Sequence, residues 1–119
     1  MVNVEERLKL YFNALNAFDL KQVEAMFAPD AVYVSAGLNA MKIGRAEIMK
    51  SFHEYFSEYS DQVSLDDRII QTGPNVFQSH WQLSATSSKT EKSLHRKGTQ
   101  ITTFNDDGLI AHVEVHDQT

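Results

Sequence analysis

The chain has 119 residues, a formal net charge of −5 and no cysteine. This length predicts one domain over residues 1–119, and the lack of cysteine excludes disulfides, thiol nucleophiles and thiolate metal sites. Lysine and arginine are scattered and form no basic stripe, so we expect no nucleic-acid partner. No apolar run approaches the roughly 18 residues of a membrane span, and the first residues lack the features of a secretory signal. We therefore expect a cytoplasmic protein that does not contact membranes.

The first part of the chain is predicted to form two helices. Apolar residues recur at helical spacing over residues 8–18. The pair Asn3 and Glu6 is typical of a capping box, in which two side chains satisfy free amides at the start of a helix. The pair Asp19 and Gln22 repeats this signal and predicts the start of a second helix.

Pro29 is expected to stop the second helix, because proline lacks the amide hydrogen that a helix needs. Residues 31–35 are β-branched or otherwise strand-forming and predict a short strand. Residues 36–42 are interpreted as a loop. A third helix is expected after Gly44, with an apolar and aromatic stripe along one side.

The second part of the chain changes from helical to alternating periodicity. Phe77, Trp81 and Leu83 share one side of a predicted strand, and polar residues occupy the other side. A polar stretch over residues 84–93 predicts a mobile hairpin loop. Strands are expected over residues 63–72, 76–86, 94–104 and 109–116. Helices followed by strands predict an α+β fold, with about three helices packed on one face of a curved, mostly antiparallel sheet.

Such a curved sheet encloses a concave, mostly apolar pocket of the kind that binds small molecules. Trp81 is expected on the inward face of its strand. Two roles stay open for it: packing in the core, or forming a flat wall for a ring-shaped ligand. In either case its indole N–H needs a hydrogen-bond partner if it is buried.

Several short phrases, taken in their order along the chain, carry a family resemblance. They resemble the nuclear transport factor 2-like superfamily, in its SnoaL-like and ketosteroid isomerase-like branch. This resemblance implies a cone-shaped fold with one deep pocket, no cofactor, and a homodimer formed through the outer face of the sheet. The phrases cover residues 11–19, 26–33, 43–48, 76–86 and 101–110.

The ketosteroid isomerases suggest a role for Tyr11. They carry a tyrosine eight residues before an aspartate, as Tyr11 precedes Asp19, and that tyrosine hydrogen-bonds the substrate oxygen as charge develops. The alternative for Tyr11 is a core residue with its hydroxyl bonded to a neighbour. The resemblance places Ser35 and Gln100 where those enzymes carry their two catalytic carboxyl groups. We therefore expect no steroid isomerase activity.

Two other related classes bear on Arg96 and Asp117. The limonene-type epoxide hydrolases set an arginine and an aspartate two residues apart, but here Arg96 precedes Gly98 by two, so that pair is incomplete. SnoaL-like polyketide cyclases use one acidic residue as acid and base, and Asp117 is the candidate for it. The alternatives are an outward Arg96 at a strand edge and a solvated Asp117 near the chain end.

Histidines are expected to gather on the outer face of the sheet. His112, Glu114 and His116 alternate along one predicted strand and so point to the same side. All three span too far for one metal ion in a straight strand, and we predict no metal site. A polar surface or a wet dimer interface is expected instead. The apolar centre of this face is assigned to Ile101 and Ile110, and His80 and His95 are expected beside them.

The sequence thus predicts a small-molecule-binding domain without a cofactor. It is either an isomerase, cyclase or dehydratase acting on an apolar, ring-containing substrate, or a non-catalytic ligand-binding or dimerisation module. The substrate itself is not identified. Catalytic roles are assigned to Tyr11 and Asp117. The predicted ligand-binding residues are Tyr33, Ser35, Phe52, Phe56, Trp81, Arg96, Gln100 and Val113.

Overall fold

The computed structural model describes residues 4–35 and 40–117. Its described elements are three helices and one six-stranded sheet with the strand order β2-β1-β6-β5-β4-β3. All neighbouring strands are antiparallel except the parallel pair β1 and β6. The predicted α+β class is therefore confirmed. In chain order the elements are α1 (Val4–Asn16), α2 (Leu20–Met26), β1 (Phe27–Ser35), β2 (Ala40–Ile43), α3 (Arg45–Glu58), β3 (Val63–Gly73), β4 (Val76–Thr86), β5 (Ser93–Phe104) and β6 (Ile110–Asp117).

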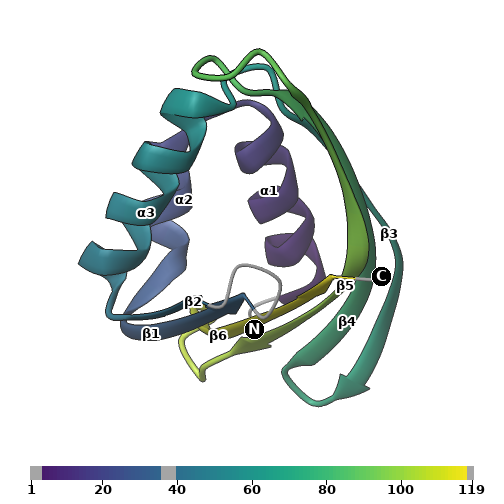
Figure 1. Cartoon of the computed structure of the whole chain (residues 1–119). Coiled ribbons are helices and arrows are strands. Elements are labelled where there is room, and N and C mark those ends of the chain that lie inside the picture. The colour runs from purple at the N-terminus through teal and green to yellow at the C-terminus, as the bar shows by residue number, and fades with distance from the viewer. Residues whose placement is uncertain (1–3, 36–39, 118–119) are drawn as a thin grey trace.

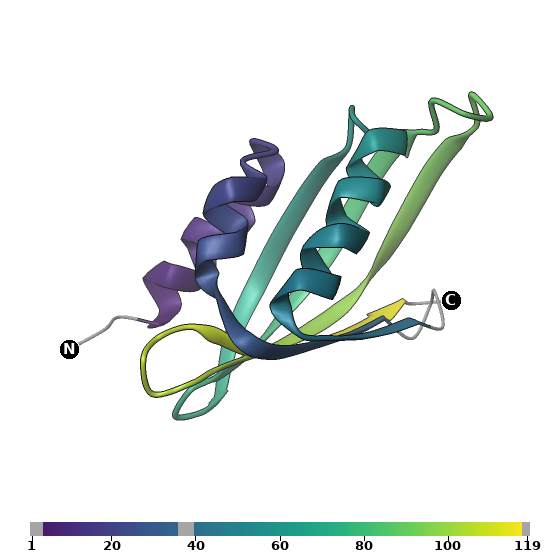
Figure 2. The same ribbon diagram turned by 90° about the vertical axis from the view of Figure 1, so that its left-hand side faces the viewer.

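The helices cover the concave face of the sheet. The long strands β3, β4 and β5 curve around α1, and α3 lies beside it over β1 and β2 (Figure 1). The view in Figure 2 shows α1 and α2 on one side and α3 on the other, with the sheet behind them. This arrangement gives the cone shape that the resemblance implies. Among the described residues, no helix combines the length and the apolarity needed to cross a membrane.

The start of α2 follows from its capping residue. Asp19 accepts a hydrogen bond of 3.2 Å from the backbone amide of Gln22, as the sequence pattern predicts. The helix ends at Met26, before Pro29, and the chain passes directly into β1. The predicted strand over residues 31–35 is thus four residues too short. Pro29 is accommodated because the pairing of β1 with β6 is irregular at this point.

The loop predicted over residues 36–42 is wrong in its second half. Residues 40–43 form β2, an edge strand paired antiparallel with β1. Residues 36–39 lie outside the described part of the chain. A four-residue edge strand shows only two alternations, exposed Met41 and Ile43 against half-buried Ala40 and Lys42, which is too little for a periodicity argument.

The core lies between the helices and the sheet. Its fully buried side chains come from every layer, and each large one stabilises the fold by about 1.5–3 kcal/mol. They include Leu8 of α1, Val23 of α2, Phe27 of β1, Ile48 of α3 and Phe77 of β4.

The prediction that Ile110 lies on the outer sheet face is wrong. Ile110 is fully buried and pairs with Phe104 on β5 and with Phe27 on β1. The pairing of β5 with β6 shifts between Thr103 and Phe104, which puts one extra residue on β6 and reverses its inward parity. Ile101, before the shift, stays half-buried opposite the outward Glu114.

Candidate functional site

A cavity of about 460 Å³ lies between the helices and the concave face of the sheet. This volume falls within the range of small-molecule sites in proteins. Its wall contains eight of the ten residues that the sequence nominates for a site. They are Tyr11, Tyr33, Ser35, Phe52, Phe56, Trp81, Arg96 and Gln100.

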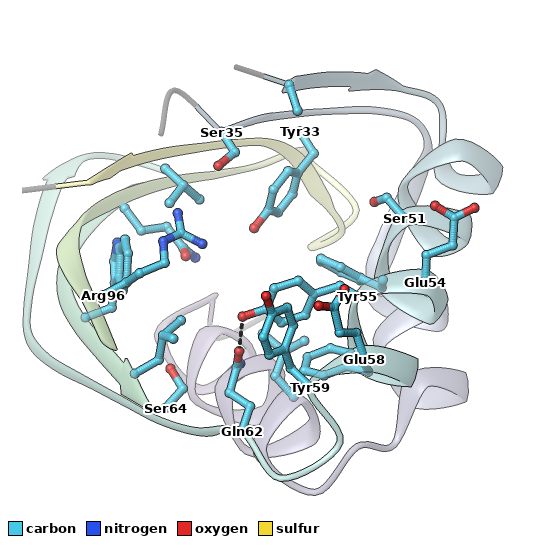
Figure 3. A pocket seen from close by; sticks show the side chains of 18 of the residues that line it. Tyr33, Ser35, Ser51, Glu54, Tyr55, Glu58, Tyr59, Gln62, Ser64 and Arg96 are labelled. Carbon is cyan, nitrogen blue, oxygen red and sulfur yellow. Dashed lines mark hydrogen bonds between the residues drawn. The ribbon is translucent and has the colours of Figure 1, made fainter. Parts of the chain in front are cut away.

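The strand register explains why these side chains meet. On β4 and β5, Leu83 is opposite Arg96 and Ser79 is opposite Gln100, so these residues share the inner face. Figure 3 shows Tyr33 and Ser35 entering the cavity from β1, with Arg96 facing them from β5. Gln100 is buried, and its side-chain amide donates to the hydroxyl of Thr102.

Asp117 does not itself line the cavity but holds a residue that does. Arg96 donates two hydrogen bonds to its carboxylate, from Nε and Nη2, each 2.6 Å long. The side chains of Arg96 and Asp117 are only 15% and 22% exposed. The alternatives of an outward arginine and a solvated chain-end carboxylate are thus wrong. The hydrogen bond to Asp117 raises the pKa of Arg96, against the opposing effect of burial.

Gly98 accounts for the way in which this ion pair forms. It is opposite Asp117 on β6 and two residues after Arg96. A Cβ atom at Gly98 would stand 1.9 Å from the backbone oxygen of His116, so no side chain fits there. The carboxylate that pairs with Arg96 therefore comes from the neighbouring strand β6.

Trp81 is both packed in the core and part of the cavity wall. Its indole is buried, and Nε1 donates a 3.0 Å hydrogen bond to the carbonyl oxygen of Thr99. The guanidinium carbon of Arg96 lies 5.4 Å from the centre of the Trp81 ring, a cation–π distance. Trp81 lines the cavity, and so offers an aromatic surface to a ligand.

The tyrosines of the cavity are neutral hydrogen-bond donors. Burial raises the pKa of Tyr11 and of Tyr33 well above the ordinary value, and raises the pKa of Tyr55 to about 12. The ring of Tyr11 packs edge-on against Phe27 at 5.6 Å and also lines the cavity, so it is a core and a wall residue at once. The hydroxyl of Tyr55 donates to Oε1 of Gln62 (Figure 3).

Val113 is not part of the cavity wall. It shares the inner face of β6 with Val115 but is fully buried in the core, opposite Thr102. Val115, two residues further along β6, lines the cavity instead. The sequence assigned the correct face and the wrong depth, because alternation defines the side of a strand and not the position of the cavity along it.

Among the wall residues that the sequence analysis missed, Asp66 is the one best suited to acid–base chemistry. It lies on β3, opposite Trp81 of β4, and lines the cavity. Burial raises its pKa to about 7; Asp67 adds to this effect and a hydrogen bond from Ser64 opposes it. Alternation along β3 pointed the other way, because the apolar residues Val63 and Leu65 are exposed and the polar residues Ser64 and Asp66 face inward.

The mouth of the cavity is bordered by the hairpin between β4 and β5, which the sequence predicts to be mobile. In the structure this hairpin is attached to the end of α3. Ser87 is buried and donates a 2.6 Å hydrogen bond to Glu58, and the amide of Ser88 donates 2.8 Å to the Glu58 carbonyl. Lys89 lines the cavity and lies 3.9 Å from the Glu58 carboxylate.

The outer histidines form no metal centre in the described part of the chain. No group of three or more potential ligands comes together there. His116 instead lies 2.7 Å from the carboxylate of Glu114, its neighbour on the same face of β6.

The comparisons with known proteins can now be set beside this geometry. The family model of the SnoaL-like domain matches residues 8–113. The chain belongs to the SnoaL-like family. The resemblance to this branch of the nuclear transport factor 2-like superfamily, inferred from the short phrases, is confirmed. A search of curated protein sequences finds no significant match.

Three similar solved structures share the SnoaL-like fold of this chain. An NTF2-like protein of unknown function from Burkholderia pseudomallei is 21% identical, with a TM-score of 0.81 over 99% of this chain and 92% of that one. An epoxide hydrolase/cyclase-like enzyme of pyran ring formation in the polyether salinomycin is 15% identical, with a TM-score of 0.85 over 98% and 91%. A putative SnoaL-like polyketide cyclase from Shewanella denitrificans is 15% identical, with a TM-score of 0.79 over 98% and 92%.

Proposed function

We propose that this SnoaL-like domain binds an apolar, ring-containing small molecule and acts on it without a cofactor, as an isomerase, cyclase or dehydratase. The observation that carries this proposal is Arg96 at the wall of the cavity, with its guanidinium over Trp81 and bonded to the carboxylate of Asp117. An aromatic surface suits a planar ring. A carboxylate whose orientation is held by two hydrogen bonds suits proton transfer.

Each wall group then has a chemical role. Trp81 supports the ring, and the neutral hydroxyls of Tyr11 and Tyr33 donate hydrogen bonds to a substrate oxygen on which charge develops. Asp117 is assigned the role of base. It does not line the cavity and both its oxygens are bonded to Arg96, so it accepts a substrate proton only when Arg96 releases one of them. Ser35 and Gln100 line the cavity without a carboxyl group, so the proposal excludes appreciable ketosteroid isomerase activity.

The structural neighbours support this reaction class by analogy of fold. Two of them are described as an epoxide hydrolase/cyclase-like enzyme and a putative polyketide cyclase. Both descriptions concern ring formation or opening, which proceeds through proton transfer to and from oxygen. The proposal for this chain rests on its own cavity residues, and the neighbours agree with it.

Binding is tested with 2-tetralone, a neutral bicyclic ketone, followed by NMR through the single indole N–H signal of the chain, that of Trp81. We expect a saturable shift of this signal. Ser35→Phe, which fills the cavity from β1, is expected to abolish the shift. Gln82→Phe, on the exposed outer face of β4, is the matched control and should retain it. A shift that is absent in the wild type, or equal in both variants, contradicts the proposed site.

The alternative function is a non-catalytic ligand-binding module. The observation in its favour is that Arg96 already occupies both oxygens of Asp117. The two functions differ in the exchange of the hydrogens next to the tetralone carbonyl in D₂O. An enzyme makes this exchange faster than it is in buffer, and Asp117→Asn should lower the enzymatic rate by on the order of 10²–10⁴-fold. Binding without acceleration favours the module.

The outer face of the sheet is proposed to form a homodimer. It presents exposed apolar side chains on the edge strands β2 and β3, which frame the histidines of the inner strands. They are Met41, Ile43, Val63, Leu65 and Ile70. The cytoplasmic location expected from the composition stays part of this proposal.

A further inference from the structure

Asp66, a carboxyl group of the cavity wall, lies in one row with Asp117. The register pairs Asp66 with Trp81, Trp81 with Gly98, and Gly98 with Asp117. These four positions therefore form one line across β3, β4, β5 and β6, on the inner face. Adjacent strands are about 4.8 Å apart, so about 14 Å of sheet separates the backbones of the two aspartates. The sheet is concave on this side, which brings the two side chains closer to each other than the backbones, on either side of Trp81.

The surroundings of the two carboxyl groups differ. Asp117 accepts two hydrogen bonds from the Arg96 guanidinium. None of the ion pairs within the described residues includes Asp66. The groups that act on Asp66 electrostatically are Ser64 and Asp67 of its own strand.

The wall of the cavity carries neutral groups and the charged side chains of Lys42, Glu54, Glu58, Lys89 and Arg96, none of which is among the groups that shift the pKa of Asp66. Tyr11 of α1 and Tyr33 of β1 are close enough for the charge of Asp66 to act on them, and both remain uncharged phenols. Trp81 of β4 lies beside it. The cation Arg96 lines the same cavity but is bonded to Asp117. These surroundings favour the protonated form of Asp66, whose pKa burial raises to about 7.

We infer that Asp66 is a second catalytic residue, which as a neutral acid donates its proton to an oxygen of a neutral ring substrate lying between it and Asp117. This inference rests on the proposed function and deepens it. Two carboxyl groups whose environments differ in this way divide the roles of acid and base between them. The preferred substrate class is a neutral bicyclic ketone, ether or alcohol; a carboxylate ligand would repel Asp66 once it ionises.

The step balances for a ketone. The Asp117 carboxylate takes a proton from the carbon next to the carbonyl, and the electron pair of that C–H bond forms a C=C bond. The carbonyl π pair moves to oxygen, which takes the Asp66 proton, and the electron pair of the broken O–H bond stays on Asp66. The products are the enol, a protonated Asp117 and an ionised Asp66. Proton exchange with water then returns Asp117 to its carboxylate form and Asp66 to its protonated form.

The first test measures the affinity for 2-tetralone at pH 5.5 and pH 8.5, with tetralin, which lacks the oxygen, as the reference ligand. A hydrogen bond from a neutral acid corresponds to about a fivefold to tenfold difference in affinity. We expect 2-tetralone to bind about that much more weakly at pH 8.5, and tetralin to bind equally at both. Among the described residues that line the cavity there is no histidine to produce the same effect.

Asp66→Asn should remove this pH dependence, because an amide keeps the shape and does not titrate. Asp67→Asn is the matched control, since Asp67 is exposed on the outer face opposite His80. The ¹³C signal of the Asp66 carboxyl should titrate near neutral pH in the free protein. Asp66→Asn should also slow the tetralone exchange in D₂O at least tenfold, and Asp67→Asn should not.

The outcomes separate the two proposals. If tetralone affinity is the same at both pH values, if the Asp66 carboxyl titrates below pH 5, or if Asp66→Asn exchanges tetralone as fast as the wild type, the inference is overturned and the binding site stands. If tetralone fails to bind at either pH, the proposed function is lost and the inference with it.

Discussion

At the scale of single residues, Gly98 determines the partner of Arg96. No side chain fits at this position on the inner face, because a Cβ atom there would lie 1.9 Å from the backbone oxygen of His116 on β6. The carboxylate that pairs with Arg96 comes from Asp117 on the neighbouring strand. A residue with no side chain thus shapes the charge arrangement of the cavity.

Gly98→Ala is predicted to destabilise the fold. The added methyl group meets backbone, which cannot move aside as a flexible side chain can, and the pairing of β5 with β6 must open. We expect a loss of on the order of 2–4 kcal/mol in the free energy of unfolding, measured by urea denaturation. Gly73→Ala is the control, because its Cβ would meet only Val76 side-chain atoms at 3.5 Å and beyond. Equal effects of the two substitutions would contradict this account.

Asp66→Asn is predicted to stabilise the protein at neutral and alkaline pH. The pKa of Asp66 rises from its ordinary value of 3.8 to about 7 on folding. Between pH 4 and 7 the folded state therefore binds more protons than the unfolded state, and wild-type stability falls as the pH rises through this window. The variant lacks this loss.

The gain of Asp66→Asn should be on the order of 2–4 kcal/mol at pH 8 and near zero at pH 4. Urea denaturation at both pH values measures it, with Asp67→Asn as the control. A variant that is less stable than the wild type at pH 8 would show that the ionised Asp66 is well stabilised in the fold.

At the scale of elements, the sequence predicts what is local and periodic. The three helices and the long strands were found because amphipathic periods extend over many residues, and because Asp19 caps α2 through the neighbouring Gln22. It missed β2, whose four residues are too few for a period, and the first part of β1 around Pro29. Both segments are strands because a neighbouring strand pairs with them.

The attachment of the β4–β5 hairpin is another feature decided between elements. Its polar residues predict a free loop, yet Ser87 is buried against Glu58 of α3. The contact joins residues 29 positions apart in the sequence, so no local sequence pattern predicts it. It places Lys89 at the cavity, so the hairpin contributes to the wall as well as to the sheet.

At the scale of the whole molecule, the outer sheet face is the surface left without helices. Its histidines are expected to lie near the centre of the proposed dimer, with the exposed apolar side chains of β2 and β3 around them. His80 and His116 both flank Thr99 on this face, and His116 lies 2.7 Å from the carboxylate of Glu114.

The dimer is predicted to weaken between roughly pH 7.5 and 5.5, because histidine side chains gain protons over this range and add like charge to both partners. Glu114 offsets part of that charge through His116. Sedimentation at several protein concentrations measures the dimer constant at both pH values. A constant that does not change rejects the role of the histidines. A monomer at high concentration and neutral pH rejects the interface.

The sequence by itself determined the fold class, the family, and the inward side of β4, of β5 and of β6 beyond its irregularity. These depend on short-range periods, on capping residues and on the order of the phrases along the chain. It also nominated eight residues of the cavity wall, including Tyr11, Trp81 and Arg96, through strand parity and the family resemblance.

Only the tertiary structure decided which charges meet. The pairing of Arg96 with Asp117, the burial of Asp66 opposite Trp81 and the inward turn of Ile110 all depend on strand register and on one irregularity in it. Register is set by contacts between residues far apart in the chain, and a shift of one residue moves a side chain to the opposite face. The acid–base properties of the cavity therefore depend on the register in which the strands pair.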